Sequence, residues 1–395
     1  MFHPAPDEVK LRRFSLDPGA PGGVVDGMRL AWASPSLGLE EQAAVLECLA
    51  SGRVSMGARV RAFEDAMCRT LGVTHAVALS SGTAALDVAL QALDVGPGDE
   101  VIVPAFTYVA TVNAVVRRGA LPVMVDVEPR TLNVDPDAVR AALTSRTRGV
   151  VFIDYGGGAA DHAALERIAR DHDTFLLHDA AHSVGTAAHG RRVGAWGVAA
   201  TLSFHVAKVV TSVEGGMVVT NDDRIAEIAR TLRNQGEPVG TKYVFTMIGH
   251  NFRLSDLHAA IGLVQLEKLD ALLARRAAVA EWYAEALRDV DEVALPAVRA
   301  GTVHGRFLFS ILARDRALRD RIEAALGRAG IETRICWPLP VYRQRAYVER
   351  VRPLSCPVAE DVPARVLSLP FHPLLTPDDV GLVARTLREA IVRAR

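Results

Sequence analysis

The sequence is poor in cysteine and lysine and carries almost no net charge. Its 395 residues include four cysteines, and none of these belongs to a CxxC pair. That spacing argues against a metal knuckle and predicts a reduced, cytoplasmic setting. The formal net charge of −1 provides no overall field that would attract nucleic acid or an anionic membrane.

Targeting segments and several common motifs are also absent. The N-terminus contains Asp7 and Glu8 but no apolar core, so we expect no signal peptide. The most apolar runs, such as the one around Val101, have strand length and do not predict a membrane span. No GxGxxG follows the first expected strand, which argues against a dinucleotide-binding enzyme. His178 and His182 lack carboxylate or cysteine companions at ligand spacing, so no metal site is predicted.

The composition is that of a globular protein with a large core. Half of the residues are apolar and 23% are charged, and at roughly 100–200 residues per domain the length predicts two or three domains. Residues 1–34 are rich in Gly, Pro and charge and are expected to form an irregular arm. In residues 35–290, apolar strand-length runs alternate with amphipathic helical runs. This pattern predicts a large α/β domain whose mostly parallel sheet is sandwiched by helices. Residues 291–395 are predicted to form a smaller α+β domain.

Individual elements follow from the same patterns. A helix is predicted at 39–50, and one long helical stretch is predicted from Ser255 to about Val290. A terminal helix is expected in PDDVGLVARTLREAIVRA. The expected strands are HAVAL, EVIVPAF, LPVMVDV, RGVVFIDY, TFLLHDAA, AATLSFH, GGMVVT and FLFSILA.

Few residues of the chain could supply a side-chain amine for catalysis. The only lysines are Lys10, Lys208, Lys242 and Lys268. Lys208 follows the apolar strand run in SFHVAK, where burial would disfavour its charge and lower its pKa. A neutral amine of this kind attacks carbonyl carbons. The other three lysines lie in polar or amphipathic segments and are expected to be solvated surface groups.

Two strand ends offer groups for a phosphate and a ring nitrogen. The turn Ser81-Gly82-Thr83 opens a helix, where N–H groups, hydroxyls and the helix dipole favour an anion, although an ordinary N-cap explains it equally well. Ser203 lies five residues before Lys208, close enough to add a hydroxyl to the same phosphate. Asp179 ends the strand TFLLHD and could pair with a protonated pyridine nitrogen, the partner that pyridoxal phosphate (PLP) requires. A loop-capping aspartate is the alternative.

In their order along the chain, these features resemble the DegT/DnrJ/StrS family of sugar aminotransferases, which have the aspartate-aminotransferase fold (PLP fold type I). The resemblance runs from about Pro35 to the C-terminus. It is carried by GPGDEVIVPAFTYVAT, HDAAHSVG, LSFHVAK, EGGMVVTNDD, HNFRLSDLHAAIGLVQLEKLD and PVAEDVPARVLSLPFHP.

The resemblance implies roles for individual residues. Lys208 matches the lysine that forms the Schiff base with PLP and moves the proton, and Asp179 matches the partner of the pyridinium nitrogen. Tyr108 stands where the family has an aromatic residue that stacks on the cofactor ring. The phosphate-binding groups correspond to Gly82, Thr83 and Ser203.

The resemblance also implies a homodimer with shared active sites. Asn251 matches an asparagine that reaches the phosphate from the neighbouring subunit. Arg253 and Arg334 are candidates for binding the carboxylate of the amino donor.

Three positions depart from the usual family pattern. His182 replaces a glutamine that contacts the 3-oxygen side of the cofactor, and histidine occurs there in some relatives, including aminohydroxybenzoate synthases. Val213 replaces a glycine before Glu214-Gly215-Gly216. The run Gly156-Gly157-Gly158 is unusually rich in glycine for a substrate-facing loop. These departures bear on the substrate more than on the cofactor.

The reaction implied is transamination, because the family's dehydratases have histidine where this chain has Lys208. We expect glutamate to donate an amino group through PLP to a keto-sugar nucleotide. The segments KVVTSVEGG and HNFRLSDLHAAIGLVQL favour a 4-keto-6-deoxyhexose. One alternative is a keto-cyclitol or aminohydroxybenzoate-type substrate. Another is a PLP-binding regulatory homologue without turnover.

Overall fold

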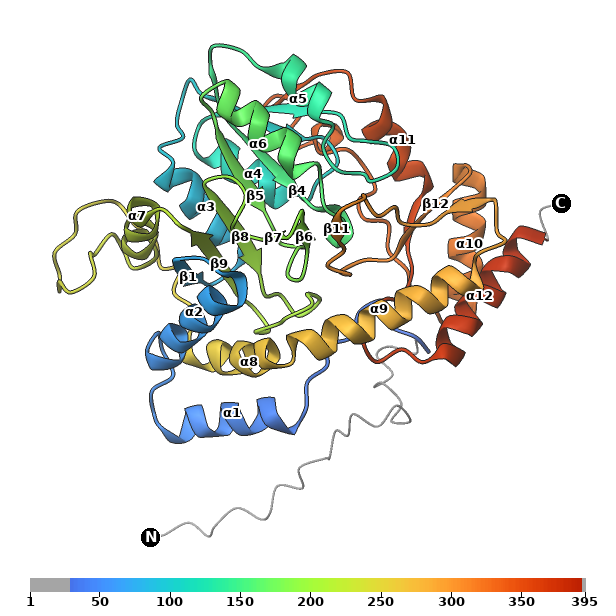
Figure 1. The fold of residues 1–395 in the computed structure, drawn as a ribbon, viewed down its shortest axis with the longest axis horizontal. Helices are drawn as coiled ribbons and strands as arrows, with labels where there is room; N and C mark the ends of the chain where they lie inside the picture. Colours follow the sequence, from blue (N-terminus) through green and yellow to red (C-terminus); the bar gives the residue numbers. More distant parts are fainter. Residues whose placement is uncertain (1–28, 393–395) are drawn as a thin grey trace, which may run out of the picture.

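The computed structural model describes residues 29–392, which fold around one large sheet (Figure 1). The sheet has eight strands in the order β1-β9-β8-β5-β4-β2-β3-β13. β9 is antiparallel to both of its neighbours, and every other neighbouring pair is parallel. The predicted α/β fold with a mostly parallel sheet is therefore confirmed. The strands are β1 (His75–Leu79), β2 (Glu100–Pro104), β3 (Leu121–Val125), β4 (Thr147–Ile153), β5 (Phe175–Asp179), β8 (Ala199–Ser203), β9 (Gly216–Thr220) and β13 (Arg352–Pro353).

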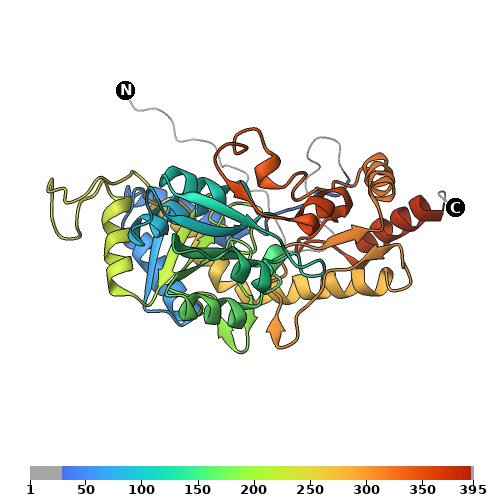
Figure 2. The ribbon, with the colours of Figure 1, turned by 90° about the horizontal axis from the view of Figure 1, so that it is seen from above.

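Helices cover both faces of this sheet (Figure 2). Alternate residues of one strand enter different core clusters: Val151 packs on one face, while Val150 and Phe152 pack on the other. Strands buried on both faces explain the continuous apolar runs of the sequence. One face is covered by α3 (Gly82–Ala92), α4 (Val109–Arg117) and α7 (Asp223–Arg233), and the other by α5 (Pro136–Ala142) and α6 (His162–Asp171).

Further helices lie beyond the β1 edge of the sheet (Figure 1). α1 (Leu39–Ala50) matches its predicted bounds, whereas α2 (Ala58–Leu71) was not predicted. The long helical stretch expected from Ser255 divides at Lys268 into α8 (Asp256–Glu267) and α9 (Leu269–Ala286). α1 and α2 both pack on α8.

Lys268 corrects one expectation from the sequence. Its Nζ lies 2.8 Å from Glu41 Oε1 and 3.1 Å from Glu40 Oε2, and its side chain is only 22% exposed. The prediction of a solvated surface lysine is therefore wrong. The amphipathic pattern of α8 and α9 could not reveal that α1 covers this position.

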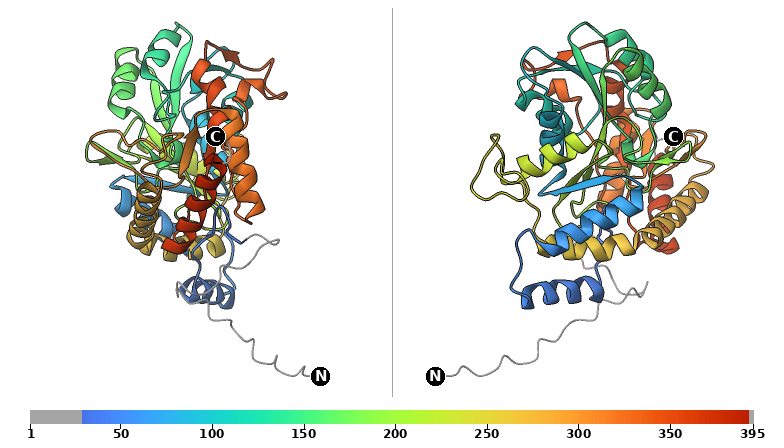
Figure 3. Two further views of the ribbon diagram at one scale, coloured as in Figure 1. Left: turned by 90° about the vertical axis from the view of Figure 1, so that its right-hand side faces the viewer. Right: turned by 60° about the vertical axis from the view of Figure 1, so that its left-hand side comes forward.

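The C-terminal part has its own sheet and core. β10 (Val293–Ala294), β12 (Ser310–Ala313) and β14 (Val366–Ser368) form a three-stranded sheet. α10 (Arg316–Arg328) and α12 (Pro377–Val392) pack against each other, and α9 reaches α12 along the length of the molecule (Figures 1 and 3). α11 (Pro357–Arg365) packs on α10 and β12.

Two features connect this part to the rest of the chain. β13 joins the edge of the large sheet beside β3. A second small sheet, not predicted, combines β11 (Thr302–Val303) with β6 (Ala187–Ala188) and β7 (Arg191–Arg192). The short 3-10 helices are η1 (Tyr155–Gly157) and η2 (Val341–Arg343). The division at residues 290 and 291 stays a prediction.

The predicted N-terminal arm lies mostly outside the described residues, as does Lys10. Of the described part of the arm, Leu30 bridges to Ile331 and the Arg29 N–H donates to the Gly330 carbonyl at 2.7 Å. Among residues 29–392, no helix is both long and apolar enough to cross a membrane.

Candidate active site

The carboxyl ends of neighbouring strands bring the sequence candidates to one edge of the large sheet. Asp179 ends β5 and Ser203 ends β8, the strand next to β5. Ser81 follows β1, and Tyr108 follows β2. This edge is the usual ligand-binding position of parallel α/β sheets.

Ser81, Gly82 and Ser203 form a narrow cradle. Ser81 is the N-cap of α3, and its Oγ accepts a hydrogen bond from the Ala84 N–H at 3.1 Å. A Cβ added at Gly82 would lie 2.9 Å from Ser203 Cβ and 3.3 Å from Ser203 Oγ. The first N–H groups of an α-helix have no partner within the helix, so those of Gly82 and Thr83 are available at a helix start that lies against Ser203.

Gly216 permits this close approach. A Cβ at Gly216 would lie 2.1 Å from the Ser81 carbonyl oxygen, so only glycine lets β9 pass the turn. The sequence interpretation of Glu214-Gly215-Gly216 as a place where backbones approach closely agrees with this packing.

Asp179 is buried, with an exposed fraction of 6%. Its Oδ2 accepts a hydrogen bond from Thr111 Oγ1 at 2.7 Å, and its Oδ1 accepts one from the Ala181 N–H at 3.3 Å. Burial raises the pKa of Asp179, although Thr111 and the charge of Lys208 act in the opposite direction. A cationic ring nitrogen at this carboxylate would stabilise its charged form. Thr111, three residues after Tyr108 on α4, was missed from the sequence because nothing there marks which helix positions face β5.

Lys208 lies in the loop that follows β8. Its Nζ is 4.3 Å from the centre of the Phe307 ring. Burial lowers the pKa of Lys208 to about 8, against the opposing effect of Asp179. The loop is closed by the Phe204 carbonyl, which accepts hydrogen bonds from the Ser212 N–H at 2.9 Å and Thr211 Oγ1 at 3.1 Å. The loop that carries the amine is therefore closed by hydrogen bonds, and the amine loses its proton at a lower pH than a free lysine does.

Val213 occupies a strained position in the same loop. Its φ is +69°, in the left-handed region that β-branched residues rarely adopt. This explains why glycine is the usual residue there. The side chain is 39% exposed and therefore gains little from burial.

His182 is a neutral hydrogen-bond donor. The Gly156 N–H donates to His182 Nδ1 at 3.3 Å, which places the ring proton on Nε2. Burial, assisted by the charge of Lys208, holds the pKa of His182 well below its usual range. Its ring centre lies 4.3 Å from that of Phe307. Histidine can therefore donate a hydrogen bond, as the glutamine of other family members does.

Close backbone contacts explain the glycine run. A Cβ at Gly157, whose φ is +92°, would lie 2.9 Å from the Arg306 nitrogen and 3.1 Å from the His182 carbonyl oxygen. The Gly156 carbonyl accepts a hydrogen bond from the Phe307 N–H at 3.0 Å. Glycine is needed here so that three segments of the site wall can touch.

Aromatic side chains form the remaining wall. Tyr108 is the N-cap residue of α4 and is 56% exposed. Its ring centre lies 6.3 Å from that of Trp337, which also stacks at 6.1 Å on His182. Trp337 comes from the C-terminal part of the chain, more than 150 residues after His182, which is why sequence reasoning missed it. Cys336, adjacent to Trp337, accepts a hydrogen bond from Tyr155 through its carbonyl at 2.9 Å.

Three sequence candidates have no side-chain hydrogen bond to this group in the described chain, although the Phe252 carbonyl accepts a hydrogen bond from the Ser80 N–H at 2.8 Å and Arg253 bridges to Leu79. Asn251 is exposed and pairs with Asn234 in an isolated bridge. The Arg253 guanidinium donates to Asn234 Oδ1 at 2.8 Å, and that of Arg334 pairs with Glu332. Within residues 29–392, none of the three has a hydrogen bond to Lys208 or Asp179. Their predicted roles remain predictions.

The residues that do converge fit PLP. The cradle at Gly82 and Ser203 suits a phosphate, the buried Asp179 suits a pyridinium nitrogen, and Lys208 supplies an amine of lowered pKa. The exposed ring of Tyr108 offers a stacking face. These groups come from the ends of four strands, β1, β2, β5 and β8, at one edge of the sheet.

Comparison with known proteins agrees with this geometry. A sequence model of the DegT/DnrJ/EryC1/StrS aminotransferase family matches residues 35–388. The structure of S. venezuelae DesV in complex with a ketimine intermediate is 36% identical, with a TM-score of 0.85, over 89% of this chain and 94% of that chain. The aminotransferase TlmJ from Streptoalloteichus hindustanus is 33% identical, with a TM-score of 0.88, over 92% of this chain and 99% of that chain.

A third similar structure is 3-amino-5-hydroxybenzoic acid (AHBA) synthase, which is 31% identical with a TM-score of 0.86, over 92% of this chain and 98% of that chain. The family match spans nearly the whole described chain, and aminotransferases of this family depend on PLP. The chain therefore belongs to the DegT/DnrJ/EryC1/StrS aminotransferase family and is a PLP-dependent aminotransferase.

Proposed function

We propose that the enzyme transfers the amino group of glutamate to the carbonyl carbon of a keto-sugar nucleotide, with a 4-keto-6-deoxyhexose as the substrate. The observation that carries the aminotransferase chemistry is the position of Lys208, whose amine of lowered pKa lies at the same sheet edge as Asp179 and the Gly82 cradle. The sugar substrate is supported by the family resemblance and by the segments around Lys208 and Asn251.

Lys208 and Asp179 are the proposed catalytic residues. Lys208 would hold the cofactor covalently, and its amine would carry the proton at the reacting carbon atoms. Asp179 keeps a proton on the cofactor's ring nitrogen through its negative charge, while Thr111 fixes the orientation of the carboxylate. Bound PLP supplies an electron-withdrawing ring that stabilises negative charge at the reacting carbon.

Five further residues are proposed to bind the cofactor. The N–H groups of Gly82 and Thr83 and the hydroxyl of Ser203 would hold the phosphate. Tyr108 would stack on the ring, and the Nε2–H of His182 would donate to its 3-oxygen. Because His182 is neutral, this donor keeps its proton and its orientation around neutral pH.

We further propose a homodimer in which Asn251 completes the partner's site. Large apolar side chains are exposed on α1 and in the 239–248 loop, including Leu46 at 54%, Tyr243 at 78% and Ile248 at 90%. Exposed apolar groups at this density favour a protein interface. Asn251 follows directly after this loop, which places it beside the proposed interface. All four cysteines are free thiols, which favours the cytoplasm as the site of action.

Product analysis tests the substrate. The holoenzyme, glutamate and a panel of nucleotide-linked 3-keto and 4-keto sugars would be incubated, and products would be identified by mass spectrometry. We expect amination of a 4-keto-6-deoxyhexose. Amination of a 3-keto sugar alone would contradict the choice of ring carbon.

A second candidate substrate is a keto-cyclitol or an aminohydroxybenzoate-type precursor. It is favoured by His182, since histidine occurs there in aminohydroxybenzoate synthases, and by the similarity to AHBA synthase. Activity on a free cyclitol ketone, with none on sugar nucleotides, would select this candidate. A regulatory role without turnover is disfavoured because Lys208, Asp179 and Ser203 are all present; a colourless purified protein would favour it.

A further inference from the structure

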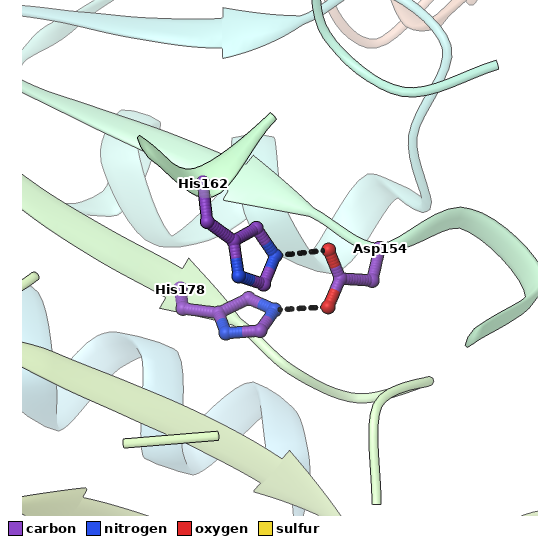
Figure 4. Close-up of side chains that lie close together, drawn as sticks. All are labelled: Asp154, His162 and His178. Carbon is purple, nitrogen blue, oxygen red and sulfur yellow. Dashed lines mark hydrogen bonds and ion pairs between the residues drawn. The ribbon is translucent and has the colours of Figure 1, made fainter. Parts of the chain in front are cut away.

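Asp154, His162 and His178 form a buried network (Figure 4), in which His178 is the neighbour of Asp179 in β5. Asp154 Oδ1 lies 2.7 Å from His162 Nε2, and Oδ2 lies 3.0 Å from His178 Nε2. The three side chains are between 0% and 2% exposed. The sequence predicted no carboxylate companion for His178. In the fold, Asp154 directly follows β4 and His162 begins α6, and both side chains lie beside His178.

The donor geometry argues against a metal ion in this group. A metal-bound imidazole normally donates its other N–H to a carboxylate, carbonyl or water. The Nδ1 atoms of His162 and His178 are buried, and neither has a hydrogen-bond partner within the described chain. With a metal on Nε2, both would be buried N–H donors without acceptors. Without a metal, His162 Nε2 is hydrogen-bonded to Asp154 Oδ1, His178 Nε2 lies 3.0 Å from Oδ2, and each Nδ1 can be an unprotonated acceptor, so no buried N–H is left without an acceptor nearby.

The network therefore surrounds one buried carboxylate with polar partners. The Ala160 N–H donates to Asp154 Oδ1 at 2.9 Å in addition to the two imidazoles. Burial alone would raise the pKa of the Asp154 carboxyl, but His178 and His162 hold it well below its usual range. Two hydrogen bonds to Oδ1, from Ala160 and His162, and the close contact of His178 with Oδ2 fix the position of this carboxylate.

Asp154 is linked to the site wall through the loop that follows it. The Asp154 carbonyl accepts a hydrogen bond from the Gly157 N–H at 3.0 Å. Within this turn, the Gly156 N–H donates to His182 Nδ1, and the Gly156 carbonyl accepts from the Phe307 N–H. The position of Asp154 thus affects where His182 and Phe307 lie, whose ring centres are 4.3 Å apart beside Lys208.

His178 is linked to the site through β5. It precedes Asp179, so its side chain points to the opposite face of the sheet. There its ring stacks on Phe152 with ring centres 4.4 Å apart, and its Nε2 lies 3.3 Å from the hydroxyl of Ser183, the neighbour of His182. His178 therefore contacts the backbone segment that contains both Asp179 and His182.

We propose that Asp154, His162 and His178 are a metal-free set of positioning residues that fixes His182 and the end of β5 relative to Lys208. This inference rests on the proposed function, because the groups that are positioned are the proposed cofactor ligands. No residue of the network contacts the substrate side of the site directly.

Three variants and one control test the proposal. His178→Leu removes the donor while keeping an apolar group against Phe152, whereas His178→Gln keeps an N–H near the position of Nε2. Asp154→Asn removes the charge. The control is Glu100→Gln. Glu100 is another buried carboxylate, 1% exposed, and it begins β2, at the end of the strand away from the site. For each protein we would measure urea unfolding without cofactor, the Kd for PLP, the absorption spectrum with PLP bound, kcat and KM, and metal content.

We expect His178→Leu and Asp154→Asn to raise the Kd for PLP about tenfold, as expected when a buried charged group loses a partner, and to change the ratio of the cofactor absorption bands. His178→Gln should restore both, and Glu100→Gln should change only the unfolding curve. The inference fails if both damaging variants bind PLP with the wild-type affinity and spectrum. It also fails if the purified protein holds one zinc ion per chain whose removal reproduces Asp154→Asn.

These results separate the two proposals. If wild-type protein binds no PLP at Lys208, the proposed function fails, and the positioning role falls with it. If wild-type protein binds PLP and the network variants behave like Glu100→Gln, only the positioning role fails.

Discussion

Gly82 and Ser203 lie in direct contact, so that a Cβ at Gly82 would be 2.9 Å from the Cβ of Ser203. Gly82 opens α3 and Ser203 ends β8. The contact places the N-terminus of α3 against the side chain of Ser203. A residue larger than glycine does not fit at position 82 unless α3 or β8 shifts. We expect binding of the cofactor phosphate to depend on this spacing.

Gly82→Ala should weaken PLP binding. The added methyl group forces apart α3 and β8, and overpacking of this kind costs about 1–3 kcal/mol, or roughly one to two orders of magnitude in Kd. The measurement is a spectroscopic titration of cofactor-free protein with PLP. Gly327→Ala is the control, because an added Cβ on α10 meets no heavy atom within 4 Å. An unchanged Kd for Gly82→Ala would contradict the role of the cradle.

Val213→Gly should stabilise the protein. Glycine adopts the left-handed backbone without strain. The relief of strain in the folded state should exceed the cost of the greater conformational entropy that glycine gives the unfolded chain, so the free energy of unfolding should rise by about 1 kcal/mol. Urea unfolding of cofactor-free protein provides the measurement. The control is Val298→Gly. Val298 is 50% exposed and does not have a positive φ, so this substitution should be neutral or destabilising. Equal effects of the two substitutions would show that Val213 is not strained.

The reactivity of Lys208 should rise at lower pH than that of a free lysine. Only the neutral amine is acylated, and burial lowers the pKa of Lys208 from 10.5 to about 8. In cofactor-free protein, the labelling rate by acetic anhydride should therefore reach its midpoint near pH 8, whereas a lysine in a reference peptide reaches it near 10.5. Asp179 raises the pKa of Lys208, so Asp179→Asn should shift the midpoint further down. A midpoint equal to that of the reference peptide would contradict the buried environment.

Substitution of His182 should separate the effect of its N–H donor from that of its imidazole ring. His182→Gln retains a donor, so kcat/KM should stay within about an order of magnitude of wild type, whereas His182→Leu should lose about 10- to 100-fold. Steady-state kinetics with saturating PLP provide the measurement. Equal losses in the two variants would argue that the imidazole itself, and not its N–H, is required.

Complementation tests the shared active site. Lys208→Ala and Asn251→Ala should each be impaired, but mixed subunits form heterodimers in which one site has both residues intact. Refolding the two variants together should restore up to about a quarter of the wild-type activity, since half of the dimers are mixed and each has one complete site. If activity does not exceed the sum of the separate variants, Asn251 acts within its own subunit.

The sequence was informative where chemistry depends on strand ends. Lys208, Asp179 and Ser203 were identified because apolar runs mark buried parallel strands, whose carboxyl ends meet at one edge. Val213 was recognised as unusual, and its φ of +69° gives the reason.

Contacts between distant segments could not be read in the same way. Phe307 and Trp337 reach Lys208 and His182 only through the packing of the C-terminal part on the large sheet. The partners of His178 became visible only when β4, β5 and α6 were placed together. Helical periodicity likewise gave no sign that Glu41 on α1 would bind Lys268.

Borohydride reduction of the PLP-loaded enzyme, followed by peptide mapping, is the most direct test of the central claim that Lys208 carries the cofactor. We predict a single pyridoxyl group, located on Lys208. A modification found on Lys10, Lys242 or Lys268 instead, or no modification at all, would contradict the assignment.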